Sequence, residues 1–143
     1  MPRPIQVKLQ RCWLVPPLIL SKIALLRFSN YNISNNKMVL ADSFALGKKW
    51  PEQIAPAGID IDHRTGILYV VTRYNQSLYT IDLKTRAVKQ YPIGAEAYAC
   101  KLSPDGKQLY ISLWSADRLM VWNTSTKIET ARLAIGDNPN ELL

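Results

Sequence analysis

Residues that carry metal or catalytic chemistry are scarce in this chain of 143 residues, which has one histidine and two cysteines. His63 stands in a turn-like segment, where a solvated side chain is far more common than a catalytic base. Cys12 and Cys100 lack the paired spacing of a metal site, and nothing else in the sequence supports a disulfide between them. A glycine-rich phosphate loop, a GxSxG turn and an HExxH motif are absent as well. We therefore predict no catalytic residue, no metal ligand and no cofactor.

Acidic residues are missing from residues 1–41, which hold six basic residues, whereas residues 42–143 hold twelve basic and eleven acidic ones. The formal charge of +7 therefore lies almost entirely in the first part of the chain. Binding to nucleic acid through phosphate neutralisation needs an excess of basic residues on the binding domain. The remainder of the chain lacks that excess, so nucleic-acid binding is not favoured.

A long apolar run is also missing from residues 1–35. The run over residues 12–20 contains Pro16 and Pro17, which break a helix, and Lys22 ends it before the length that spanning a membrane needs. No small-residue cleavage site follows. We predict no membrane span here, and we expect a poorly ordered, non-repeat segment. An export signal, an anchor, a transit peptide and a frame-shifted, non-native stretch remain open as explanations of it.

The rest of the chain repeats itself. The phrase "ILYVVTRYNQSLYTIDLKT", which begins at Ile67, returns as "QLYISLWSADRLMVWNTST", which begins at Gln108, at a spacing of 41 residues. A shorter phrase occurs three times, as "FALG" from Phe44, "YPIG" from Tyr91 and "LAIG" from Leu133. A fixed period of this length is typical of a repeat architecture.

Each repeat unit reads as four strands, because short runs of Ile, Leu, Val, Tyr and Thr alternate with turn residues. In the first unit we expect strands at residues 58–61, 67–72, 77–82 and 87–93. The turn "SPDG" at residues 103–106 and "DHRTG" at residues 62–66 provide glycine where positive φ is needed. The middle strands are apolar almost without alternation, which predicts that both faces of each sheet are covered.

Four strands at a period of about 40 to 45 residues are typical of a β-propeller blade. The predicted fold class is therefore all-β, an incomplete β-propeller of about two and a half four-stranded antiparallel blades after the N-terminal segment. The predicted units are residues 36–47 as the end of a blade, residues 56–94 and 97–136 as two repeats, and residues 137–143 as the start of another blade. Open strand edges would favour self-association or the remaining blades of a larger parent protein as partners.

The phrases "SPDGKQLYIS" and "LYVVT" resemble the YVTN repeat of YncE-like β-propellers over residues 36–143. The stretch "LADSFALGKKWPEQIAPAGIDID" is further similar to the propeller half of bacterial two-part proteins that join a YncE-like domain to an alkaline-phosphatase-like domain. The resemblance implies a periplasmic or extracellular protein. One departure is that Asp62, His63 and Arg64 stand where the family has Ser-Pro-Asp.

In an antiparallel meander, the connections between second and third strands share one end with the links between blades. We expect a candidate binding face at this end, formed by Trp50, Arg73, Tyr74, Tyr98 and Trp114. Loops that differ between repeats often carry function, and Arg73 occupies the repeat position of Trp114. Arginine and aromatic residues are enriched at binding hot spots. The alternative is that Trp50 and Trp114 only pack blade against blade.

These observations favour a non-catalytic segment that binds an unknown protein or small ligand, from a larger exported bacterial protein. One alternative is that the chain is the propeller part of an enzyme, either with a phosphatase-like domain outside these residues or as a lactonase-like propeller. Another is that it is a truncated product without activity. A lactonase would need polar groups facing the channel, for which Asp60, Asp62 and Lys101 are the available residues. Asp60 and Asp62 do not read as a metal pair, because Lys101 and Ser103 stand at their repeat positions.

Overall fold

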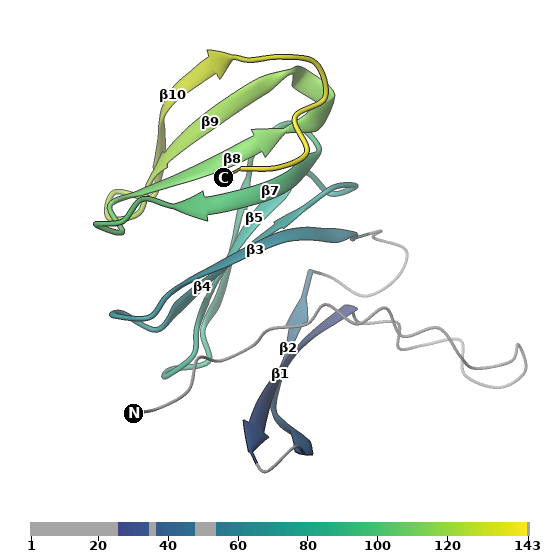
Figure 1. The fold of residues 1–143 in the computed structure, drawn as a ribbon, viewed down its shortest axis with the longest axis vertical. Helices are drawn as coiled ribbons and strands as arrows, with labels where there is room; N and C mark the ends of the chain where they lie inside the picture. Colours follow the sequence, from purple (N-terminus) through teal and green to yellow (C-terminus); the bar gives the residue numbers. More distant parts are fainter. Residues whose placement is uncertain (1–25, 35–36, 48–53, 143) are drawn as a thin grey trace, which may run out of the picture. The chain divides into compact units, whose positions relative to one another are not determined.

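The computed structural model describes residues 26–34, 37–47 and 54–142 of the chain. These residues form ten strands and one short 3₁₀ helix (Figure 1). The chain divides into two compact units, Met1–Glu52 and Gln53–Leu143. No helix in the described part of the chain is long and apolar enough to cross a membrane.

The first unit contains an antiparallel pair of strands, β1 (Leu26–Ser34) and β2 (Lys37–Leu46), whose register shifts between Asn30 and Tyr31. Strand β1 lies within the N-terminal non-repeat segment of residues 1–35. A physical reason for this strand is visible in the sequence, because Phe28, Tyr31 and Ile33 are residue types that favour strands. The predicted boundary between residues 35 and 36 falls between the two strands, and residues 1–25 lie outside the described part.

The second unit begins with a four-stranded antiparallel sheet in the order β3-β4-β5-β6. Its strands are β3 (Pro56–Asp62), β4 (Ile67–Thr72), β5 (Ser77–Asp82) and β6 (Val88–Pro92). The bounds of β4 and β5 coincide with the predicted ranges. Neighbouring strands in the chain are neighbours in the sheet, as in a meander.

A second sheet repeats this arrangement in the order β7-β8-β9-β10. It contains β7 (Ala97–Leu102), β8 (Gln108–Leu113), β9 (Arg118–Asn123) and β10 (Ile128–Ala134). The 3₁₀ helix η1 (Trp114–Ala116) lies between β8 and β9, where the first sheet has only a short loop. The prediction of two four-stranded antiparallel units is confirmed.

Matching polar side chains shape the turns of both sheets. The Asp82 carboxylate accepts hydrogen bonds from the N–H groups of Lys84 and Thr85, at 2.8 and 3.1 Å. At the same repeat position, Asn123 Oδ1 accepts bonds of 2.9 Å from the N–H groups of residues 125 and 126. Gly66 and Gly106 adopt φ of 77° and 67°, a region that favours glycine, as their turn positions predicted.

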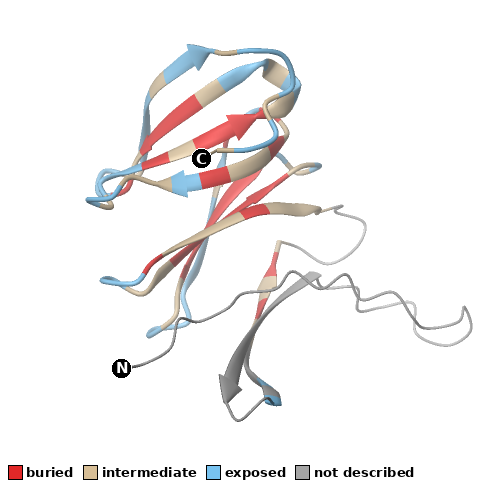
Figure 2. Cartoon of the chain, in the orientation of Figure 1, coloured by how far each residue is buried: buried red, intermediate tan, exposed pale blue. Residues whose placement is uncertain are grey.

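The hydrophobic core lies between the two sheets and is dominated by the middle strands (Figure 2). Its buried side chains from both sheets are Tyr69, Val71, Leu78, Ile93, Ala95, Ala97, Cys100, Leu109, Ile111, Leu113, Met120 and Trp122. Burying a side chain of the size of Leu78 or Ile111 stabilises the fold by about 1.5–3 kcal/mol. The outermost strands β6 and β10 are mostly exposed. The apolar pattern of the middle strands therefore identified the buried layers correctly.

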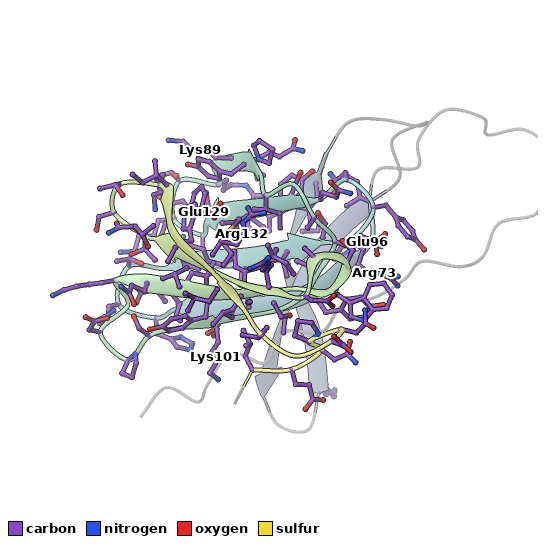
Figure 3. All side chains as sticks on the ribbon, turned by 90° about the horizontal axis from the view of Figure 1, so that it is seen from above. Arg73, Lys89, Glu96, Lys101, Glu129 and Arg132 are labelled. Carbon is purple, nitrogen blue, oxygen red and sulfur yellow. The ribbon has the colours of Figure 1, made fainter. Side chains whose placement is uncertain are left out.

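The two sheets meet most closely along their first strands, β3 and β7. A Cβ added to Gly58 would lie 2.7 Å from Ala99 Cα and 2.8 Å from Cys100 N, which leaves room only for glycine. At the opposite edge, Arg132 on β10 pairs with Glu129 at 2.8 Å and donates a hydrogen bond of 3.1 Å to the carbonyl of Ile93 (Figure 3). Backbone contacts and polar links thus fix the two sheets to each other.

Candidate binding face

The connections between strands gather at two ends of the second unit. Because consecutive strands are antiparallel, connections alternate between these ends. We call one end the loop end, formed by residues 73–76, 93–96, 114–117 and 135–138. The other is the turn end, formed by residues 63–66, 83–87, 103–107 and 124–127. The candidate face predicted from the sequence belongs to the loop end.

Arg73 lies at the centre of an aromatic cluster at the loop end. Its guanidinium carbon is 4.6 Å from the ring centre of Tyr98, 5.5 Å from that of Tyr74 and 5.9 Å from that of Trp114. A cation within about 6 Å of an aromatic ring centre is attracted by the negative face of the ring. Arg73 belongs to the first sheet, whereas Tyr98 and Trp114 belong to the second. The cluster therefore spans two blades.

A carboxylate completes the surroundings of Arg73. Glu96 Oε2 accepts bonds of 3.3 Å from both Nε and Nη2 of Arg73, and the two side chains lie beside each other (Figure 3). The side chains are 27% and 26% exposed, so solvent weakens this ion pair without removing it. The backbone N–H of Arg73 also donates to the carbonyl of Ala55, at 2.8 Å. Arg73 is consequently held at both its backbone and its side chain.

Helix η1 positions Trp114, one of the two aromatic residues that the second sheet contributes to the cluster. Trp114 begins this short helix, and its ring lies 5.4 Å from that of Tyr98 at a tilt of 41°. The Asn138 side chain donates to the carbonyl of Trp114 at 3.2 Å, and Ser115 Oγ accepts a bond of 3.0 Å from the Glu96 N–H. Links from two other chain segments therefore hold the Trp114 turn in place.

The structure brings four of the five predicted face residues together, namely Arg73, Tyr74, Tyr98 and Trp114. The fifth, Trp50, lies outside the described residues. Tyr74 is 54% exposed, whereas Tyr98 and Trp114 are half-buried. Glu96 lies in the link between blades, which the alternation of connections already assigns to this end. Its pairing with Arg73 depends on side-chain geometry that the repeat pattern does not describe.

At the turn end, residues that replace the expected Ser-Pro-Asp phrase form a polar link between the sheets. Asp62 accepts bonds from the N–H and Nε of Arg64 at 3.0 and 3.2 Å, and Arg64 Nη2 donates to the carbonyl of Asp105 at 2.6 Å. Burial raises the pKa of Asp62, but hydrogen bonds from Arg64 and Thr65, together with the charge of Arg64, leave it below its usual value. His63 is exposed in this turn. The stretch from Asp62 to Arg64 therefore makes a contact between the two sheets.

The polar residues considered for a lactonase-like site are mostly engaged in structural hydrogen bonds. Asp60 Oδ2 accepts a bond of 2.7 Å from the Leu102 N–H, and Asp62 is bonded to Arg64. Lys101 is exposed on β7 (Figure 3). Within the described residues, no group of three or more His, Cys, Asp or Glu side chains is arranged to hold a metal ion.

Two buried groups at the blade junction have strongly raised pKa values. Burial, with smaller effects of Asp62 and Tyr91, raises the pKa of Tyr69 to about 12. Burial and the nearby Asp60 carboxylate also raise the pKa of the Cys100 thiol. Both groups are therefore neutral near pH 7, and neither is activated as a nucleophile or a base.

No family model and no curated protein matches this chain. Solved structures do match it. A periplasmic gluconolactonase of Pseudomonas aeruginosa has a TM-score of 0.66 and 13% identity over 80% of this chain and 35% of its own. Sqt1 of Saccharomyces cerevisiae has a TM-score of 0.66 and 12% identity over 78% and 30%. Kuenenia stuttgartiensis hydrazine synthase has a TM-score of 0.63 and 18% identity over 76% and 30%.

These neighbours are β-propeller-like proteins, and the chain spans about a third of their length. At such low identities the likeness concerns the fold alone. Together with the two repeated sheets, it defines the second unit as blades of an incomplete β-propeller, the class that the period of the sequence predicted.

Proposed function

We propose that this chain is a non-catalytic binding segment of a YVTN-repeat, YncE-like β-propeller whose loop end meets a protein or a small ligand. The observation that carries the proposal is the guanidinium of Arg73, held among three aromatic rings and a carboxylate at one end of two adjoining blades. Arginine, tryptophan and tyrosine dominate binding hot spots, because they offer large contact areas together with polar groups.

The exposed rings distinguish a binding role from a purely structural one. Arg73 links the two blades, and this structural role alone would explain why Tyr98 and Glu96 lie next to its side chain. It does not explain why Tyr74 stands 54% exposed beside the same guanidinium. Exposed aromatic surface next to an ordered arginine supports a partner at this face. The resemblance to exported bacterial propellers favours a periplasmic or extracellular partner.

An enzymatic propeller is the second candidate, since two of the structural neighbours are named as a gluconolactonase and a virginiamycin B lyase. The hydrogen bonds that engage Asp60 and Asp62 weigh against it. Incubating the purified chain with gluconolactone and following ring opening tests this candidate. Hydrolysis that exceeds the spontaneous rate and is lost in an Asp60→Asn, Asp62→Asn variant would replace the binding proposal.

The binding proposal is tested by chemical crosslinking and affinity capture with the full chain from a bacterial periplasmic extract. The test variant is Arg73→Ala with Trp114→Ala, and the matched control is Lys84→Ala with Lys107→Ala at the turn end. We expect a partner captured by the wild type to fall by about tenfold or more with the test variant, which is the size of a hot-spot effect. The control should retain it. Equal capture by both variants would contradict the proposal.

A further inference from the structure

The two ends of the propeller blades carry opposite charge. With the strand ends that adjoin it, the loop end has a net charge of −1, and the turn end has a net charge of +2. The charged residues of the loop end are Arg73, Glu96, Asp117, Arg118 and Asp137, and those of the turn end are Asp62, Arg64, Asp82, Lys84, Arg86, Asp105, Lys107 and Lys127. The loop end is thus acidic and the turn end is basic. A partner that approaches the aromatic cluster meets the acidic end.

The carboxylates of the loop end lie beside the Trp114 turn. Asp117 directly follows helix η1, and its Oδ1 accepts a bond of 2.8 Å from the N–H of Asn138. The side chain of Asn138 in turn bonds to the Trp114 carbonyl. Asp137 is the preceding residue, and both aspartates are exposed. The basic residue next to them is Arg118, at the start of β9.

The cluster already holds one cation, which belongs to the chain itself. The Arg73 guanidinium is surrounded by Tyr74, Tyr98 and Trp114 and pairs with Glu96. This contact shows that aromatic faces and a carboxylate at this end are arranged in the manner that suits a cation. Because Glu96 is engaged with Arg73, Asp117 and Asp137 are the carboxylates that a second cation would meet.

We propose that the partner of the loop end is a basic peptide segment, whose arginine or lysine side chains lie over the exposed ring of Tyr74 and the half-buried ring of Trp114 and pair with Asp117 and Asp137. The proposal rests on the proposed function and specifies its ligand class. Charge complementarity selects a cationic partner over an acidic one, since an acidic segment would be repelled by these carboxylates.

Fluorescence anisotropy with the full chain tests this inference. The probes are two labelled seven-residue peptides of the same length, one alternating glycine with arginine and the other glycine with glutamate. We expect the arginine peptide to bind at least about tenfold more tightly, and its affinity to fall as salt is raised. The variant Asp117→Asn with Asp137→Asn should weaken binding by about fivefold, and the turn-end control Lys84→Ala with Lys107→Ala should leave it unchanged.

Failure of this inference is distinguishable from failure of the proposed function. If Arg73→Ala with Trp114→Ala abolishes partner capture while the arginine peptide binds no better than the glutamate peptide, the loop end binds a partner that is not basic. The ligand class is then wrong and the binding function stands. Arginine-peptide binding that is insensitive to Asp117→Asn with Asp137→Asn would also overturn the inference, because the cation would then be recognised elsewhere.

Discussion

Asp60 on β3 accepts a hydrogen bond of 2.7 Å through Oδ2 from the backbone N–H of Leu102 on β7. This bond joins the first strands of the two blades at the place where a sheet edge would otherwise present an unpaired donor. The repeat position of Asp60 in the second blade is Lys101, which has no acceptor to offer. The junction between these two blades is therefore specific in a way that the strand pattern does not describe.

Replacing Asp60 by alanine should destabilise the fold, because it leaves the Leu102 N–H without its acceptor. We expect the free energy of unfolding to fall by about 1–3 kcal/mol, the usual cost of an unsatisfied donor. Urea unfolding followed by tryptophan fluorescence measures this change. Lys101→Ala is the matched control, and it should stay within about 0.5 kcal/mol of the wild type. Equal effects of the two substitutions would show that the bond adds nothing.

Gly58 sets the distance between the same two strands. An alanine Cβ there would lie 2.7 Å from Ala99 Cα, and backbone cannot move aside as a flexible side chain can. We expect Gly58→Ala to destabilise the fold by about 1–3 kcal/mol, as overpacking usually does. Gly136→Ala is the control, since nothing lies within 4 Å of a Cβ at that position. A thermal unfolding midpoint unchanged by Gly58→Ala would mean that the blades do not pack this closely.

Much of the fold could be predicted from the sequence, because a repeat of strands and turns is a local pattern. The ranges of β4 and β5, the positive φ of Gly106 and the side-chain cap at Asn123 all follow from residue types at fixed positions. The contacts between blades could not be predicted in this way. The link from Arg64 to Asp105 depends on how two blades are rotated against each other, and single repeats contain no information about it.

The candidate face shows the same division. Placing Arg73, Tyr98 and Trp114 at one end needed only the alternation of connections in a meander. Placing the guanidinium over the Tyr98 ring needed the length and direction of the Arg73 side chain. The role of Glu96 as the partner of Arg73 was missed for that reason.

Asp82 should contribute to the acid sensitivity of the fold. Hydrogen bonds from the N–H groups of Thr85 and Lys84 hold its pKa below the usual value of 3.8. A carboxyl with a lowered folded-state pKa stabilises the fold above its unfolded-state pKa, and this contribution is lost as the pH falls through the folded-state value. In Asp82→Asn, which copies Asn123, we expect a shallower loss of stability below about pH 4. Urea unfolding from pH 7 to pH 2 measures the slope, and an unchanged slope would argue against this role.

Cys100 should resist thiol reagents in the folded protein. Its side chain is buried between the blades, and burial and the Asp60 charge raise its pKa, so the reactive thiolate is scarce. A Cys12→Ser variant leaves Cys100 as the single thiol. We expect its labelling by iodoacetamide, followed by mass spectrometry, to be slow in buffer and complete in concentrated urea. Rapid labelling in buffer would show that the blade junction opens readily.

The central claim, that the Arg73 cluster faces a partner, is tested most directly by Tyr74→Ala. Tyr74 is exposed, so its removal should change the free energy of unfolding by less than about 0.5 kcal/mol. Partner capture and the unfolding midpoint are measured on the same preparation. The account predicts that capture falls by about tenfold while the midpoint stays unchanged. Unchanged capture with a lowered midpoint would contradict it, because the cluster would then serve only to hold two blades together.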